Sequence, residues 1–213
     1  MHLTYKEIDD NLFHSPLPTD YDSRPAEVYS FVPSQYKSLT EELNTYSEEL
    51  YYKDTHRLLN NYKFLNFYEF SFVSVFKQDK KVVGFATGYE RDFYPKNSVR
   101  ILNRYYQDKT NLRIDFTREI LRPTTFNCIL QQLELVKRLN FDSAFISREI
   151  RAVKFFEKFI KKLDIESGYS WEYKKGPFLL SPNQQDEKSW QSIGVVNLNN
   201  KSDFWSYWKC KQS

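Results

Sequence analysis

One short stretch of the sequence carries side chains suited to holding a phosphate group. Arg122 and Pro123 precede Thr124 and Thr125, and an amphipathic run begins at Phe126. The start of a helix presents free backbone N–H groups to an anion, and an arginine can neutralise the charge of that anion. Proline suits the first helical position, where its missing N–H is no loss. A helix that a threonine merely caps would use the same residues, so both interpretations remain open.

Acidic side chains that could act as a general base lie near the ends of strand-like stretches. Glu90 ends the apolar stretch VVGFATGYE, and Asp92 and Glu149 are further acidic candidates. A carboxylate at the end of a strand can equally be a solvated charge. The three histidines are spaced neither as a metal site nor as a catalytic pair, so no metal is expected.

Alternation and helical periodicity predict the elements that position these side chains. FSFVSVF (70–76) and VVGFATGYE (82–90) flank a polar turn, which predicts an antiparallel hairpin. SVRILNRYY (98–106) predicts another strand, and the long helix follows it. FDSAFIS (141–147) then predicts a short buried strand, after which Ser147 is placed to cap the next helix.

The long helix has one continuous apolar stripe, which includes Phe126, Leu133 and Leu139. Its other residues, Gln131 and Gln132 among them, are predicted to cover the polar side. The pattern therefore predicts a helix that packs its Phe126–Leu139 stripe on a sheet.

The ends of the chain give weaker patterns. LTYKEI (3–8) is assigned as a first strand, and the proline-rich region 15–33 as loop. Ser38 and Glu41 have capping-box spacing, which predicts a helix over 38–60, either continuous or broken near Asp54. GYSWEYKK and WQSIGVVNL predict two closing strands. The order combines a hairpin with helical crossovers, so the fold class is α/β or α+β, with one mixed, mostly antiparallel sheet flanked by helices.

Composition restricts the class of protein. A chain of 213 residues favours one domain, and 16 Tyr, 18 Phe and 4 Trp supply large buried area for its core. The net charge of +3 is too balanced for wholesale binding to nucleic acid or to an anionic membrane. No apolar run is long enough to span a membrane, no signal peptide is recognisable, and Cys128 and Cys210 are expected to be free thiols. A soluble, cytoplasmic protein is expected.

These motifs together resemble the GCN5-related N-acetyltransferase (GNAT) superfamily. KQDKKVVGFATG (77–88) is similar to the hairpin motif of that family, and FISREIRAVKFFEKFI (145–160) to a later strand and helix. Residues 98–140 correspond to its central strand, cofactor-binding turn and long helix. The resemblance is best over 70–163. It implies a single GNAT-like domain over 1–213, with an aromatic C-terminal tail at 201–213.

The resemblance also implies a reaction, the transfer of an acetyl group from acetyl-CoA to the amine of a small-molecule or protein acceptor. In the family's turn, Arg122 takes the basic position, while Thr125 and Asn127 replace glycines that allow close approach to the pyrophosphate. Phe156 stands where many members have a tyrosine that protonates the leaving thiolate. By resemblance, Glu90 is the candidate catalytic base, and the candidate cofactor-binding residues are Arg122, Thr124, Thr125, Phe126, Asn127 and Ser147.

The same departures motivate an alternative hypothesis, a non-catalytic domain of this fold that binds a protein or single-stranded nucleic acid. The aromatic and basic segment 103–113 has the chemistry for base stacking and phosphate contacts, although a solvated strand and loop would look the same. Trp205 and Trp208 in the tail could dock on a partner or fold back over the core. The acceptor and the oligomeric state are left open.

Overall fold

The computed structural model divides the chain into two compact units. Unit 1 contains Met1–Gly88 and Asn103–Leu135, and unit 2 contains Tyr89–Leu102 and Val136–Ser213. Each unit is a sheet with helices packed on it. The residues that the structure describes are 5–16, 27–53, 65–105, 123–149, 153–180, 190–199 and 203–212.

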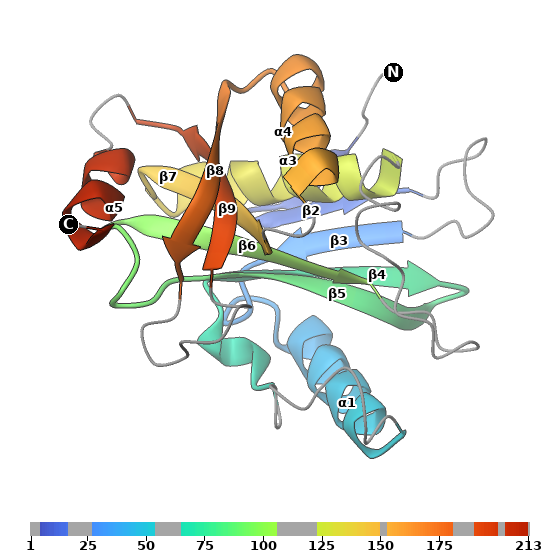
Figure 1. Ribbon diagram of the computed structural model, residues 1–213. Helices are drawn as coiled ribbons and strands as arrows, with labels where there is room; N and C mark the ends of the chain where they lie inside the picture. The colour runs from blue at the N-terminus through green and yellow to red at the C-terminus, as the bar shows by residue number, and fades with distance from the viewer. Residues whose placement is uncertain are drawn as a thin grey trace. The chain divides into compact units, whose positions relative to one another are not determined.

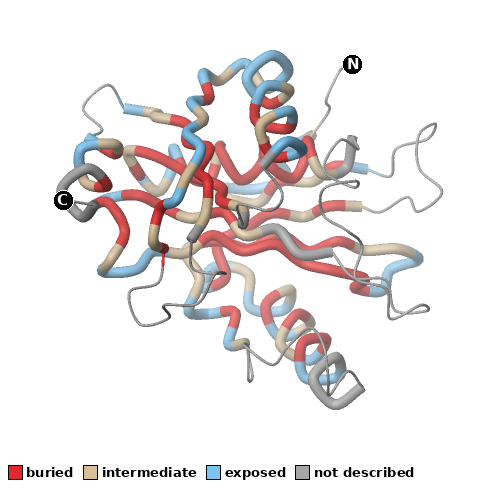
Figure 2. Tube along the Cα trace, in the orientation of Figure 1, coloured by how far each residue is buried: buried red, intermediate tan, exposed pale blue. Residues whose placement is uncertain are grey.

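Unit 1 is built on five antiparallel strands in the order β1-β2-β3-β4-β5 (Figure 1). The buried residues lie mainly on β3, β4 and β5, which are coloured as buried along most of their length (Figure 2). The strands are β1 (Lys6–Asp9), β2 (Leu12–Ser15), β3 (Glu27–Phe31), β4 (Phe72–Gln78) and β5 (Lys81–Tyr89).

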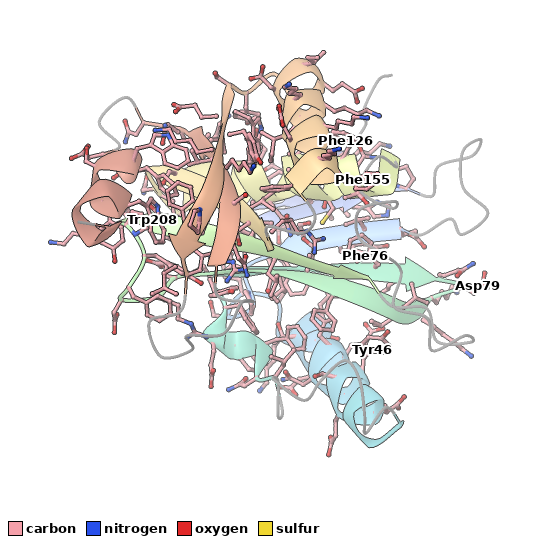
Figure 3. All side chains as sticks on the ribbon, in the orientation of Figure 1. Tyr46, Phe76, Asp79, Phe126, Phe155 and Trp208 are labelled. Atoms are coloured by element: carbon pink, nitrogen blue, oxygen red, sulfur yellow. The ribbon has the colours of Figure 1, made fainter. Side chains whose placement is uncertain are left out.

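The predicted hairpin is confirmed as β4 and β5. Their two-residue turn is Asp79 and Lys80, with φ angles of 49° and 64°. Two positive φ angles give the turn the twist that antiparallel strands require. Asp79 marks the tip of this hairpin in Figure 3.

The prediction of loop over 15–33 is wrong for Glu27–Phe31, which is the β3 strand between β2 and β4. Pro25 and Pro33 flank this short strand in the sequence. Because prolines are typical of loops, their presence led to the prediction of a loop. The predicted first strand is also shifted, because β1 begins at Lys6, and β2 was not predicted.

Helix α1 (Lys37–Lys53) begins one residue before Ser38, so the predicted capping box is wrong. The hydroxyl of Thr40 donates instead to the carbonyl oxygens of Pro33 and Tyr36, at 2.9 and 3.0 Å. Leu43 of α1 is fully buried in one cluster with residues of the sheet and of the short helix η1 (Phe67–Glu69). The rest of the predicted helix, from residue 54, lies outside the described residues.

Helix α3 (Pro123–Arg138) begins at the predicted proline, but two residues of its predicted polar side are buried. Gln131 and Gln132 are fully buried, and they donate to the hydroxyls of Ser15 and Ser74 at 2.7 and 3.0 Å. Cys128 packs on the same side, in a cluster with residues of β3, β4 and β5. The stripe residues Phe126, Leu133 and Val136 are buried as well, at most 1% exposed, so α3 is buried on both its apolar stripe and part of its predicted polar side.

Unit 2 contains the parallel pair of the fold. β6 and β7 are parallel, while β7–β9 and β8–β9 are antiparallel, in the order β6-β7-β9-β8. The expected class, helices on a mixed and mostly antiparallel sheet, is confirmed. The elements are β6 (Ser98–Tyr105), β7 (Ser143–Glu149), α4 (Val153–Glu166), β8 (Trp171–Leu179), β9 (Trp190–Asn197) and α5 (Phe204–Gln212).

The two faces of the unit 2 sheet are covered by different helices. On one face Phe145 packs against Phe204 of α5, in a cluster that includes Trp208 (Figure 3). On the other face Ile160 of α4 lies over Gly194 of β9. The aromatic tail thus folds back on the core as a helix. Among the described residues, no helix is long and apolar enough to cross a membrane.

Candidate functional site

Strands β6 and β7 part within unit 2. Their parallel pairing runs from Ser98 and Ser143 only as far as Arg100 and Phe145. Within unit 2, β6 continues beyond that point through Leu102, and β7 stays paired to β9 as far as Glu149. The parting therefore occurs at the carboxyl ends of two adjacent parallel strands, which is where open α/β sheets place their ligand crevices.

A polar network occupies the sheet at the point of separation. The guanidinium of Arg100, the last paired residue of β6, donates to Tyr94 Oη at 3.2 Å and to Gln191 Oε1 at 3.1 Å. Ser147 Oγ donates to the same Gln191 oxygen at 2.7 Å. One amide oxygen of β9 thus holds a cation from β6 and a hydroxyl from β7, which ties together the three strands around the opening.

Tyrosine side chains extend this network. The ring of Tyr94 packs edge-on against Phe145, with centroids 5.1 Å apart, and the guanidinium of Arg100 lies 6.0 Å from the ring centroid of Tyr89. Burial raises the pKa of Tyr94 well above its usual value, although the positive charge of Arg100 opposes that rise. Tyr94 therefore remains a neutral phenol at any physiological pH.

The predicted cofactor-binding residues at the start of α3 are described only in part. Phe126 and Asn127 are buried, and Thr125 is half-buried. The side-chain oxygen of Asn127 has no hydrogen-bond partner within the described part of the chain. An ionised phosphate has no proton to donate to that oxygen, so a ligand group that pairs with it in this orientation must carry an N–H or O–H donor. Arg122 and the side chain of Thr124 lie outside the described residues.

Ser147 was predicted to cap a helix, and that prediction is wrong. It lies inside β7, and α4 begins only at Val153. The burial of the AFIS run (144–147) extends the strand past the hydroxyl, which bonds Gln191 instead. The position of Ser147 beyond the last β6–β7 pair keeps it a candidate for contact with a ligand.

The candidate base and the expected position of the catalytic tyrosine differ sharply in exposure. Glu90 is exposed and lies one residue after the end of β5. Phe156 is buried on α4, where it packs against Phe159 and edge-on against Tyr173. Phe156 is therefore a core residue of unit 2, in addition to having no proton to give.

His14 takes part in a polar cluster of unit 1. His14 Nε2 lies 3.0 Å from Glu27 Oε2, and the hydroxyl of Tyr29 donates to the same oxygen at 3.0 Å. The His14 and Tyr29 rings are stacked, with centroids 4.4 Å apart. His14 and Glu27 are 13 positions apart on neighbouring strands, so spacing along the chain could not reveal the pair.

Several solved structures are similar to this chain. The IAA acetyltransferase of Bacillus cereus ATCC 14579 is 9% identical, with a TM-score of 0.43, and the match covers 80% of this chain and 98% of that one. The Bacillus subtilis acetyltransferase in complex with CoA is 10% identical, with a TM-score of 0.36 and coverage of 88% and 99%. A probable acetyltransferase of the GNAT family from Chromobacterium violaceum ATCC 12472 is 6% identical, with a TM-score of 0.41 and coverage of 92% and 98%.

No protein-family model and no curated protein matches the sequence. With identities of 6–10% and TM-scores below 0.5, these solved structures are similar to this chain and carry no argument about its family or activity.

Proposed function

We propose that this chain is a divergent acyl-CoA-dependent N-acyltransferase that transfers an acetyl group from acetyl-CoA to an amine. The observation that carries the proposal is the separation of β6 from β7 after Arg100 and Phe145, at the carboxyl ends of parallel strands. A sheet with no ligand to accommodate would gain hydrogen bonds by continuing the pairing.

The separated strands suit the arm of an acyl-CoA. Residues 146–149 of β7 pair with β9 on one side only, among the pairings described. Backbone groups on the other side can bind the amides of an extended ligand as they would bind a strand. The half-buried network of Arg100 and Gln191 holds the strand ends in place and supports this opening.

Acetyl-CoA would supply an acyl group activated as a thioester. Glu90 is the proposed base, because its exposed carboxylate can take a proton from an acceptor ammonium arriving from solvent. Since Phe156 is buried and has no proton, the departing thiolate would take its proton from solvent. Most of the rate would then come from positioning of the amine against the thioester.

Isothermal titration calorimetry with acetyl-CoA tests the proposal. We expect saturable binding, and Arg122→Ala should raise the Kd about tenfold through loss of a charge-assisted contact. Arg138→Ala, at the opposite end of α3, is the matched control and should leave the Kd unchanged. Absence of binding at millimolar acetyl-CoA overturns the function, whereas an unchanged Kd in Arg122→Ala overturns only the assignment of the turn.

A further inference from the structure

Strand β8 bulges where it passes Gln191, the residue of β9 at the centre of the polar network. Lys174 pairs with Ile193 and Phe178 pairs with Gln191, so four positions along β8 match only two along β9. A bulge bends its strand locally and is common beside functional sites, where it re-aims a side chain. Gly176 is the middle residue of this bulge.

Gly176 lies closer to the backbone of β9 than a residue with a side chain could. A Cβ added at this position would lie 2.2 Å from the carbonyl oxygen of Gln191 and 2.8 Å from its carbonyl carbon. The backbone N–H of Gly176 also donates to the buried hydroxyl of Ser192 at 3.0 Å. Gly176 therefore holds β8 against two successive residues of β9, and this close approach requires the absence of a Cβ.

Gln191 has a strand on each side, so a displacement caused by β8 is passed on to β7. Gln191 pairs with Phe178 of β8 on one side and with Glu149, the last residue of β7, on the other. Carbon and oxygen atoms that are not bonded lie about 3.3 Å apart or more, so a methyl group at position 176 would displace Gln191 by about 1 Å. Residues 146–149 of β7, which border the opening, lie in the direction of that displacement.

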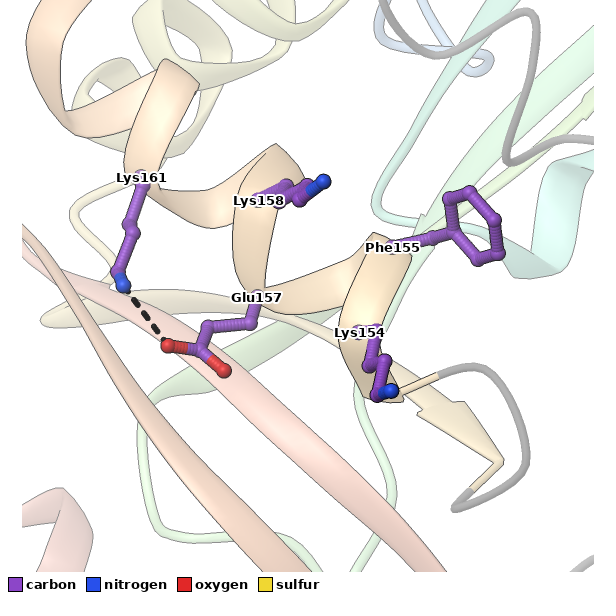
Figure 4. A pocket seen from close by; sticks show the side chains of 5 residues that line it. All are labelled: Lys154, Phe155, Glu157, Lys158 and Lys161. Carbon is purple, nitrogen blue, oxygen red and sulfur yellow. Dashed lines mark ion pairs between the residues drawn. The ribbon is translucent and has the colours of Figure 1, made fainter.

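Helix α4 covers one face of β9 beside the bulge. Ile160 of this helix lies over Gly194, which is two positions from Ser192 and shares its face of the strand. Figure 4 shows α4, with Glu157 and Lys161 forming an ion pair of 2.8 Å at its surface. Because Ile160 is buried, β9 has little room to move toward α4, and the displacement stays within the sheet.

The hydrogen bonds of Gln191 do not tolerate such a displacement. Its side-chain oxygen accepts from the Arg100 guanidinium at 3.1 Å and from Ser147 Oγ at 2.7 Å. A separation about 1 Å longer lies outside the range of an effective hydrogen bond in both cases. Gly176 is thus connected through Gln191 to both strands that border the opening, to β6 at Arg100 and to β7 at Ser147.

We propose that Gly176 is a positioning residue for the binding of acyl-CoA. It allows β8 to bulge against Gln191, whose amide oxygen then holds Arg100 and Ser147 in place at the opening between β6 and β7. The inference rests on the proposed function. A side chain at position 176 distorts the opening without removing any group that could contact acyl-CoA.

Calorimetry with acetyl-CoA tests this role. Gly176→Ala should raise the Kd about tenfold, because both hydrogen bonds of the Gln191 side chain are lost together. In a Gln191→Ala background, which already lacks those bonds, Gly176→Ala should change the Kd less than twofold. Gly168→Ala is the matched control. Gly168 has a φ of 74° and a Cβ there would meet no atom within 4 Å, so alanine strains only its own turn and should leave the Kd unchanged.

The outcomes separate this inference from the proposed function. If the wild type binds acetyl-CoA and Gly176→Ala binds it equally well, the inference is wrong while the function stands. If the wild type binds no acetyl-CoA, the function fails and the inference with it. If Gly176→Ala raises the Kd as much in the Gln191→Ala background as in the wild type, or if Gly168→Ala raises it equally, Gly176 does not act through Gln191 and the inference is wrong.

Ser192→Ala is a second variant for the case that Gly176→Ala does not fold, as measured by circular dichroism. It removes the hydroxyl that accepts the N–H of Gly176 and adds no atoms. The Kd should rise about threefold in the wild-type background and less than twofold in the Gln191→Ala background. An unchanged Kd in Ser192→Ala would overturn the inference.

Discussion

The packing of α4 on β9 can be tested by one substitution, Gly194→Ala. A Cβ added at position 194 would lie 2.2 Å from Cδ1 and 2.6 Å from Cγ1 of Ile160. Carbon atoms pack comfortably at about 3.5–4.0 Å, so the side chain of Ile160 must move by more than 1 Å. Ile160 is 1% exposed, and its surroundings leave little room for that movement. We expect a loss of about 2 kcal/mol in the free energy of unfolding, as is typical of overpacked cores.

The loss in the free energy of unfolding is measurable by urea denaturation. All four tryptophans, at positions 171, 190, 205 and 208, belong to unit 2, so their fluorescence reports on the unit that contains the contact. With a denaturant dependence of about 2 kcal/mol per molar urea, the midpoint should fall by about 1 M. Ile165→Ala, on the same helix but 82% exposed, is the control and should move the midpoint very little.

A double-mutant cycle tests whether the contact between the added Cβ and Ile160 causes the loss in the free energy of unfolding. Ile160→Ala alone should cost about 3 kcal/mol through the cavity it leaves. In that background the alanine at 194 meets no isoleucine and partly fills the space, so it should cost almost nothing. The two effects would then fall short of additivity by about 2 kcal/mol. Additivity within about 0.5 kcal/mol would refute the contact and with it the placement of α4 on β9.

Two further predictions concern titratable groups of unit 1. Burial raises the pKa of the Cys128 thiol to about 12, so in a Cys210→Ser variant Ellman's reagent at about pH 8 should label it only after unfolding; labelling of the native protein at the rate of a free thiol would contradict this. Burial, and then the neighbouring Glu27 carboxylate, raise the pKa of Tyr29 to about 12. Because the unfolded phenol ionises near 10.0, Tyr29 stabilises the fold below that pH and loses this contribution as pH rises toward about 12. Tyr29→Phe should therefore lose less stability than the wild type over this window, measured by urea denaturation at both ends; equal losses would argue against the raised pKa.

The parts of the fold that were predictable are those whose signal is local. The β4–β5 hairpin was visible because two alternating apolar runs flank a polar turn, and Asp79 is of a residue type that tolerates the positive φ that the turn needs. The start of α3 at Pro123 was also predictable, because proline is favoured at the first position of a helix. β3 was missed because Pro25 and Pro33 border a strand of only five residues.

The burial of Gln131 and Gln132 on α3 was not predictable from the periodicity of the helix. The apolar stripe gives the angle of one side of a helix, but it does not say which partner that side meets. Gln131 and Gln132 were assigned to water, yet Ser15 and Ser74 accept their hydrogen bonds inside unit 1. Polar residues can be buried where the partner strand offers hydroxyls, and a single sequence does not show such pairs.

The candidate site was only partly predictable because it is assembled from distant segments. The sequence indicates Ser147 as a helix cap, whereas the structure places it inside β7, and no local pattern indicates Arg100 or Gln191. Arg100 and Gln191 are 91 positions apart, and only the order β6-β7-β9 brings their side chains together. The parting of β6 from β7 after Arg100 is likewise a property of the assembled sheet, which no local pattern in the sequence indicates.

Hydrogen exchange with and without acetyl-CoA tests most directly whether the opening between β6 and β7 holds the donor. The account predicts that the ligand slows exchange of backbone amides in residues 146–149 of β7, while the β4–β5 turn at Asp79 and Lys80 stays unchanged. Slowed exchange confined to other segments, or no change at saturating acetyl-CoA, would contradict it.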